Sequence, residues 1–365
     1  MSKYPQLEIN LDKLRDNIKK IKELCRASNI QVAGVIKGAN SLLEIAKVYD
    51  EENVSFIASS RIEQLKKLKD KINTPLLLTR LPMLSEVKDV IKYSNISLNS
   101  EIEVIKKLNK EAKKQNKIHE VILMKEVGDL REGYYSDEEL INDALFIENN
   151  LDNISLAGLG INIGCYGSVT PSKKTLQKLV DTAKKVEKAL GRKLKYLSGG
   201  STSSLTRVID KTIPKEINLL RIGEAILTGK ELEELYGCKT ELNKDIFTLK
   251  AEVIEIKDKP SYPDGEILCD AFRHKPKYID KGIRKRAILA IGKADYGYLE
   301  GLISKDEGIE LIGASSDHTI LDVEDYKKEI KLGDIIELNI RYIPMIYLTN
   351  SKEIKKVFIS EEKNG

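Results

Sequence analysis

The chain has 365 residues, of which 41% are hydrophobic and 32% charged, so it can bury a sizeable core without disulfides or a structural metal. The 61 Lys and Arg residues nearly balance the 57 Asp and Glu residues, which disfavours a dedicated nucleic-acid or membrane-surface protein. The four cysteines form no C-x-x-C pair, and no apolar run approaches the ~20 residues of a membrane span. We therefore expect a cytosolic protein of one or two domains.

Short apolar runs alternate with charged amphipathic segments over the first two thirds of the chain. A first helix is predicted over 11–25, where Leu, Ile and Cys repeat at helical spacing. The eight runs predicted as strands are 31–37, 54–59, 75–80, 96–99, 120–127, 155–162, 195–199 and 219–222. The intervening segments, including 61–71, 101–115, 136–149 and 172–190, carry Leu and Ile on one face and are predicted as helices.

This alternation predicts an α/β fold in which residues 1–237 form a (β/α)8 barrel. An open doubly wound sheet is the alternative, but it would normally bring a Gly-rich nucleotide turn, whereas the turn after the first strand reads Lys-Gly-Ala-Asn over 37–40. Residues 238–365 are predicted to form a C-terminal all-β domain, with which the first residues of the chain are candidates to pair. Its strands are expected within 245–257, 284–294, 309–324 and 334–349.

Polar residues at the strand ends are the candidates for a site, because barrels of this kind build active sites at the C-terminal ends of their strands. Lys37 directly follows the apolar run of the first strand. Burial at the barrel mouth would lower the pKa of its amine and favour Schiff-base chemistry. A solvated surface lysine is the competing interpretation.

Arg131 lies between two glycines after the fifth strand, in the segment 128–133. Glycine lets the backbone approach a ligand, and arginine suits a bidentate grip on a carboxylate. A loop with a surface salt bridge is the alternative.

The seventh strand ends in a Gly/Ser run over 198–204, and the eighth ends in Arg-Ile-Gly-Glu over 221–224. The loops after strands seven and eight commonly seat a phosphate in such barrels, where backbone N–H groups at a helix start can hold it. A lysine at the mouth, an arginine and a phosphate cradle, without a set of metal ligands, together fit pyridoxal phosphate (PLP).

On these residues the sequence resembles the alanine racemase family of fold-type III PLP enzymes. The segments that carry the resemblance are 34–37, 128–133, 198–204, 218–224, 282–292 and 311–318. The resemblance implies that Lys37 carries PLP and serves as one catalytic base. It also implies that Arg131 helps to bind the substrate carboxylate and that Arg221 bonds the pyridine nitrogen. The other residues that it assigns to the cofactor are Asn162, Ser201, Thr202, Ser203, Gly223, Glu224 and Tyr342.

The sequence departs from the family at three positions. Lys293 stands where the family has its second catalytic base, a tyrosine. The carbamylated lysine that supports the family arginine is replaced by Met124, with Lys125 one residue away, and the tyrosine after the PLP lysine becomes Ser41.

A racemase that moves a proton across one carbon needs groups on both faces, so a replacement base is expected. His318 is the first candidate because it could titrate near neutral pH, and Lys293, Tyr296 and Cys165 are rivals. The resemblance implies a homodimer in which the C-terminal domain of one subunit, with His318 and Asp317, completes the site of the other.

The expected activity is therefore that of a PLP-dependent amino-acid racemase, an isomerase, acting on ornithine or a similar basic amino acid. A terminal ammonium group would need an acidic partner, for which Asp129, Glu132, Glu224 and Asp317 are candidates. An alanine or broad-specificity racemase, a PLP-dependent D-amino-acid lyase and a PLP-carrier protein are the alternatives. We expect no metal, nucleic acid or membrane as a partner.

Overall fold

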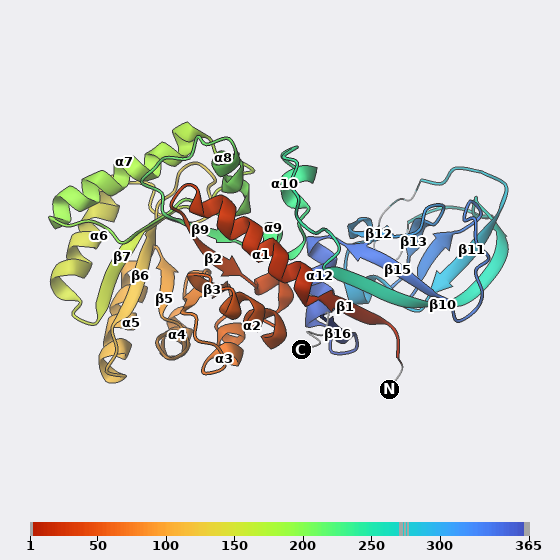
Figure 1. The fold of residues 1–365 in the computed structure, drawn as a ribbon, viewed down its shortest axis with the longest axis horizontal. Coiled ribbons are helices and arrows are strands. Elements are labelled where there is room, and N and C mark those ends of the chain that lie inside the picture. Colours follow the sequence, from red (N-terminus) through yellow and green to blue (C-terminus); the bar gives the residue numbers. More distant parts are fainter. Residues whose placement is uncertain (1–2, 270–272, 274, 276, 361–365) are drawn as a thin grey trace. The chain divides into compact units, whose positions relative to one another are not determined.

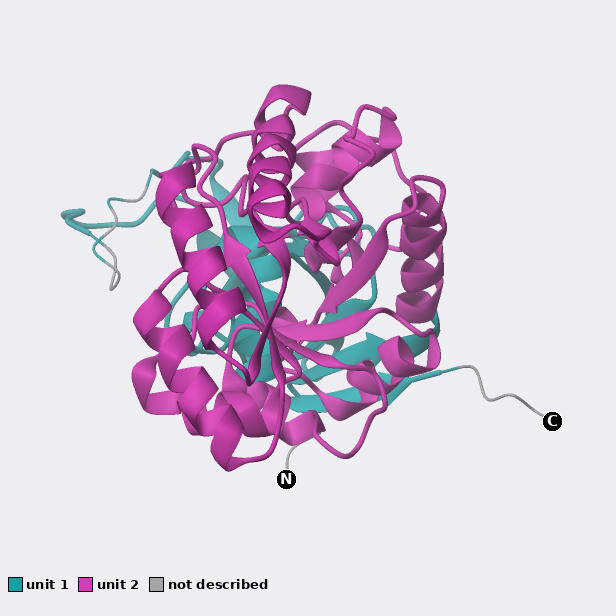
Figure 2. Ribbon diagram, turned by 90° about the vertical axis from the view of Figure 1, so that its left-hand side faces the viewer, with its two compact units in different colours: residues 1–12, 245–365 teal, residues 13–244 magenta. Residues whose placement is uncertain are grey.

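The computed structural model describes residues 3–269, 273, 275 and 277–360. The chain divides into two compact units, one of residues 13–244 and one of residues 1–12 with 245–365 (Figure 2). The sequence-based boundary after residue 237 lies shortly before the change of unit at residues 244 and 245. No helix in the described part of the chain is long and apolar enough to cross a membrane.

Residues 13–244 contain a closed barrel of eight parallel strands, with helices around it (Figures 1 and 2). Each strand pairs with the next, and the first strand also pairs with the last, with Ala33 opposite Arg221. The strands are β2 (Gln31–Val35), β3 (Phe56–Ser59), β4 (Leu76–Leu78), β5 (Ile96–Asn99), β6 (His119–Met124), β7 (Ile154–Gly160), β8 (Tyr196–Ser198) and β9 (Leu219–Ile222). All eight predicted strands and the barrel are confirmed.

Helices form in the predicted first segment and in the four named amphipathic segments, and shorter helices form elsewhere in the barrel unit. They are α1 (Leu11–Arg26), α2 (Leu43–Glu51), α3 (Ile62–Leu68), α4 (Val87–Tyr93), α5 (Ile102–Lys114), α6 (Asp137–Asn150), α7 (Lys173–Leu190), α8 (Leu205–Ile209), α9 (Glu224–Leu227) and α10 (Glu231–Glu234). Three 3-10 turns are η1 (Lys37–Ala39), η2 (Leu84–Glu86) and η3 (Thr202–Ser204). Ser136 and Ser172 cap α6 and α7 by accepting backbone N–H bonds, which satisfies donors that a helix start leaves unpaired.

Alternation along the strands decides which side chains reach the barrel mouth, because every second residue faces the interior. Buried residues of the interior include Ala33, Val35, Ile122, Met124 and Leu219. Arg221 continues the inward row of β9 two residues after Leu219, and Lys37 begins the 3-10 turn that follows β2. By the same alternation Glu126 faces inward after β6, whereas Lys125 faces outward.

Gly34 allows α2 to pack directly on β2. A Cβ atom at this position would lie 2.3 Å from Cδ1 of Tyr49, whose side chain is fully buried. The Tyr49 ring of α2 therefore packs directly against β2, the strand that precedes Lys37.

The second unit is a largely antiparallel sheet. Its strands are β1 (Gln6–Asn10), β10 (Phe247–Pro260), β11 (Ile283–Leu289), β12 (Leu302–Ser304), β13 (Glu310–Ala314), β14 (Thr319–Asp322), β15 (Ile335–Ile340) and β16 (Lys355–Ile359). β1 pairs with β10 in antiparallel and with β16 in parallel orientation, so the first residues of the chain do join the β unit.

Two segments predicted as strands end in helices instead. The segment 284–294 runs from β11 into α11 (Lys293–Tyr296), which the 3-10 turn η4 (Leu299–Gly301) follows, and 334–349 runs from β15 into α12 (Tyr342–Asn350). The apolar run of α12 suits either structure, but Pro344 lies in its first turn, where a missing N–H costs nothing. Met345 and Leu348 are then buried on one helix face.

Candidate active site

Lys37 lies at the C-terminal end of β2, in a tightly fixed turn. Asn40 and Ser41 both have a φ of 49°, and the Asn40 N–H bonds the Lys37 carbonyl at 3.1 Å. The Gln64 side chain holds this turn from α3, since its Nε2 donates to Asn40 Oδ1 at 3.1 Å. Ser41 is buried, and its hydroxyl lies 3.5 Å from Gln64 Oε1.

The surroundings of Lys37 favour the neutral form of its amine. Desolvation lowers the pKa of Lys37 first, and the nearby cations Arg131 and Arg221 lower it further, whereas Cys165 and Glu132 act in the opposite direction. The side chain is open to solvent at the mouth, yet the surrounding loops still remove part of its hydration. The pKa of Lys37 is therefore lowered in the expected direction, although the side chain is exposed rather than buried.

Arg221 is a buried cation at the end of β9. Its Nη1 donates to Ser198 Oγ at 2.5 Å and its Nη2 to the Ile161 carbonyl at 2.8 Å. Burial lowers the pKa of Arg221 to about 10; the charge of Glu132 raises it, and that of Arg131 lowers it further. Arg221 forms no ion pair within the described residues, and a buried charge of this kind favours a bound acceptor.

The Glu126 carboxylate fixes the backbone of the loop that carries Arg131. One Glu126 oxygen accepts the Gly128 N–H, and the other accepts the Arg131 N–H at 3.2 Å. The loop is closed at Gly133, whose φ is 123°; a Cβ there would lie 2.8 Å from the Glu126 nitrogen. This bend allows the Glu132 carboxylate to contact the side chain of Arg131, the preceding residue.

Arg131 is held by two neighbours. Its Nε and Nη2 both donate to the Glu132 carboxylate, and its Nη1 donates to Cys165 Sγ at 3.1 Å. Desolvation lowers the pKa of Arg131, but the bonds and charge of Glu132, with a further contribution from Cys165, more than offset this and raise it overall.

Asp129 fixes the neighbouring loop after β7, a role that the sequence did not indicate. It is fully buried, and its oxygens accept hydrogen bonds from Asn162 Nδ2 at 2.9 Å and from the N–H groups of Gly164, Cys165 and Tyr166 at 3.2–3.3 Å. Neither oxygen of Asp129 is thus available to a substrate ammonium group. Asn162, predicted to lie beside a cofactor ring, is oriented by this carboxylate.

The residues predicted as a phosphate cradle lie together at the ends of β8 and β9. Ser201 precedes η3, and Thr202 Oγ1 accepts the Ala225 N–H of α9 at 3.4 Å. Ser203 is buried and donates to the Ile163 carbonyl at 3.2 Å. Gly223 precedes α9, so the start of this helix faces the hydroxyl-bearing turn.

Two acidic side chains beside this cradle were not predicted as a pair. Burial raises the pKa of Glu224 to about 8, and the charges of Glu231 and Glu234 add to this while Lys230 opposes it. Burial likewise raises the pKa of Glu231 to about 7, against the lowering effect of the Thr202 hydroxyl. These carboxyl groups can therefore carry protons near neutral pH.

Neither Met124 nor Lys125 provides an amine beneath Arg131. Met124 is part of the barrel interior. Lys125 points outward, where its Nζ donates to the Tyr135 carbonyl at 2.6 Å and lies 3.0 Å from Asp137 Oδ1.

In the β unit, the structure brings Lys293, Asp317 and His318 to one loop cluster. The Lys293 N–H bonds the Ser315 carbonyl at 2.9 Å, and His318 Nδ1 lies 3.5 Å from Ser315 Oγ. Asp317 and His318 are both exposed. Two candidate bases thus share one surface of this unit.

The two tyrosines predicted in this unit differ in their setting. Tyr296 is fully buried and bonds Thr319 Oγ1 at 2.8 Å, and burial raises its pKa to about 12, which makes it a poor base at neutral pH. Tyr342 is the first residue of α12, on a helix rather than on the predicted strand.

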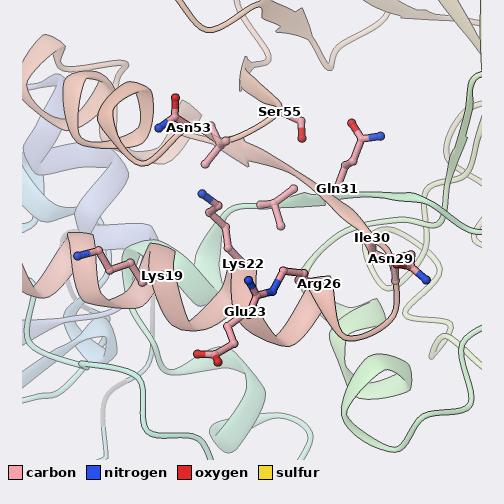
Figure 3. Close-up of a pocket in the computed structure, with 11 residues that line it drawn as sticks. Lys19, Lys22, Glu23, Arg26, Asn29, Ile30, Gln31, Asn53 and Ser55 are labelled. Atoms are coloured by element: carbon pink, nitrogen blue, oxygen red, sulfur yellow. The ribbon is translucent and has the colours of Figure 1, made fainter.

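A cavity of about 550 Å³ lies at the opposite end of the barrel strands. Lys19, Lys22 and Arg26 of α1 line it together with Gln31 at the start of β2 (Figure 3). This end of a (β/α)8 barrel serves stability rather than catalysis, and none of the predicted site residues lines the cavity.

A family model described as "Alanine racemase, N-terminal domain" matches residues 9–230. The chain belongs to the alanine racemase family. An alanine racemase family relative, the ornithine racemase of Acetoanaerobium sticklandii, is 44% identical over 97% of this chain and 99% of its own length. The lysine racemase of Thermotoga maritima is 34% identical over 97% and 98% of the two chains.

Solved structures of this family share the fold. The alanine racemase of Bacillus anthracis with bound L-Ala-P gives a TM-score of 0.76 at 18% identity, covering 100% of this chain and 97% of the other. That of Clostridium difficile gives 0.73 at 22% identity, covering 98% and 97%. The barrel followed by a β unit is therefore the alanine racemase architecture.

Proposed function

We propose that this chain is a PLP-dependent racemase that interconverts the L and D forms of ornithine or a similar basic amino acid. The observation that carries the proposal is the 44% identity, along 97% of the chain, to an ornithine racemase. The second relative is named for lysine, whose side chain also ends in an ammonium group.

The residues at the barrel mouth fit PLP. Arg221 is buried without an ion pair among the described residues and offers N–H donors to an acceptor such as the pyridine nitrogen. Lys37 offers an amine with a lowered pKa, and the turn at Thr202 and Ser203, with the start of α9 at Gly223, offers hydroxyl and N–H groups for a phosphate. Ser201, Glu224 and Asn162 complete the proposed set on the barrel, and Tyr342 of the β unit is proposed as a further phosphate ligand.

When bound, PLP supplies an electron sink that makes the Cα proton of an amino acid removable. Lys37, whose neutral amine is favoured by its surroundings, accepts or returns that proton on one face. Arg131 binds the substrate carboxylate through its guanidinium. Arg221 stays protonated at neutral pH, because even its lowered pKa is about 10, so it donates a hydrogen bond and keeps its own proton.

The second face needs a base from elsewhere. We propose that the chain works as a homodimer and that His318 or Lys293, which share one loop cluster, supplies this base to the partner's site. Asp317, exposed beside His318, contributes to substrate binding there.

The activity is tested by following the optical rotation of L-ornithine with the purified chain and added PLP, with lysine, arginine, alanine and serine as further substrates. We expect loss of rotation with ornithine or another basic amino acid. Absence of racemisation with all five refutes the proposal, and release of glycine or pyruvate would indicate a lyase instead.

The cofactor assignment is tested by absorbance before and after borohydride, in the natural chain, Lys37→Ala and the control Lys47→Ala. Lys47 is an exposed residue of α2. We expect a visible band that borohydride removes in the natural chain and the control but that Lys37→Ala lacks. A reducible band that persists in Lys37→Ala would mean that another lysine carries the cofactor.

A further inference from the structure

The Glu132 carboxylate accepts two hydrogen bonds from the guanidinium of Arg131, the preceding residue. Neighbouring side chains on a loop usually diverge, but here Leu130 has a φ of 55° and Gly133 one of 123°, and the Glu126 carboxylate holds the turn from inside. Glu132 is mostly buried, with 13% of its side chain exposed, against 36% for Arg131. The contact is thus imposed by a rigid loop rather than by two mobile surface groups.

The geometry of the contact determines which part of Arg131 remains for a ligand. A guanidinium has five N–H donors in a plane. Glu132 accepts from Nε and Nη2, which form one edge, and Cys165 accepts from Nη1. The donors that no described residue takes up are one N–H on each of the two terminal nitrogens, and these remain for a bound carboxylate.

Glu132 also supplies a negative charge close to the basic side chains at the barrel mouth. Its negative charge acts on Lys37 and on Arg221 as well as on Arg131. The cations Arg131 and Arg221 repel each other at this mouth, so a fixed anion beside them keeps Arg131 from turning away.

We propose that Glu132 is a positioning residue that holds Arg131 with its terminal nitrogens directed at the substrate carboxylate. The part that concerns substrate rests on the proposed racemase function. The orientation of Arg131 itself does not, and it can be tested without any turnover.

Cys165 provides the first test because its sulfur is exposed and receives an Arg131 N–H. The rate of alkylation by iodoacetamide at neutral pH is measured by peptide mapping, with exposed Cys269 as the internal reference. If Glu132 holds Arg131, Glu132→Gln lets the guanidinium leave the sulfur, and we expect the alkylation of Cys165 to slow at least about threefold, because a fixed neighbouring cation favours reaction at a cysteine sulfur. Loss of a nearby negative charge alone would speed the reaction, so an unchanged or faster rate overturns the inference.

Kinetics with ornithine provide the second test. We expect Glu132→Gln to raise KM about tenfold with kcat changed less than about threefold, because the lost interaction acts on a group bound in ground and transition states alike. Glu132→Asp retains the charge and should recover most of the effect, and Glu138→Gln, an exposed acid on α6, should behave as the natural chain. An unchanged KM in Glu132→Gln overturns the substrate part. If the natural chain racemises nothing, the proposed function fails and the alkylation rate alone decides the orientation of Arg131.

Discussion

Asp129 is expected to be the main support of the loop after β7. Replacing it with Ala removes a buried carboxylate that four donors share: the Asn162 amide and the N–H groups of Gly164, Cys165 and Tyr166. Asp129→Asn keeps the volume but turns an NH2 group toward two of these donors. Both variants should release the segment 162–166, which carries Asn162 and Cys165.

The size of the effect follows from which donors water can reach. A buried donor without an acceptor costs about 1–3 kcal/mol. The residues Gly164, Cys165 and Tyr166 are exposed and can turn to water once released, whereas Asn162 is buried. We therefore expect a loss of about 3 kcal/mol in the free energy of unfolding of the barrel unit, the upper end of the cost of one buried donor left without an acceptor. For a unit of this size that corresponds to a fall in Tm of about 6–12 °C.

The assay is thermal unfolding followed by far-UV circular dichroism, with limited proteolysis to locate the released segment. Asp152→Ala serves as the control, since Asp152 is exposed on the turn before β7. Cleavage within 162–166 should appear in the Asp129 variants before global unfolding. A Tm within about 1 °C of the natural chain, with no new cleavage, would refute the idea that this carboxylate supports the loop.

Two further predictions concern pH and carbon dioxide. The pKa of Glu231 is about 7 in the folded chain and about 4.3 when unfolded, so the folded chain holds an extra proton between these values and loses stability as pH rises through about 7. Glu231→Gln, which mimics the neutral acid, should raise Tm at about pH 8 and leave it unchanged near pH 4, below both values; equal shifts at both pH values would contradict this account. Because Asp137 and the Tyr135 carbonyl engage the Lys125 amine, added bicarbonate should leave the racemisation rate of CO2-depleted protein unchanged, and a bicarbonate-dependent rate would show a carbamate in use.

The barrel was predictable because each element depends on local pattern. Continuous apolar runs predict the strands, amphipathic periodicity predicts the helices, and the alternation of the two predicts their closure. β16 was missed because KKVFI is short and gains its order from β1, more than 300 residues away in sequence. For α12 an unbroken apolar run carries no period that separates helix from strand.

The candidate site was likewise predictable only where it depends on local sequence pattern. Lys37 and Arg221 could be placed at the mouth because each stands at the C-terminal end of an apolar run predicted as a barrel strand. Glu126 and Asp129 could not, because they act on backbone N–H groups of loops whose path the sequence does not specify. The grip of Glu132 on Arg131 depends in turn on that path, so residue type alone left it among the candidates for an ammonium partner.

The close approach of Tyr49 to Gly34 has a consequence for how this chain can change. With the Tyr49 ring 2.3 Å from where a Cβ would stand, no larger residue at position 34 is compatible with that ring. A smaller side chain at position 49 alone would open a void behind the strand that bears Lys37. Positions 34 and 49 should therefore vary together among related sequences, and attempts to redesign the mouth through β2 should vary both residues as one unit.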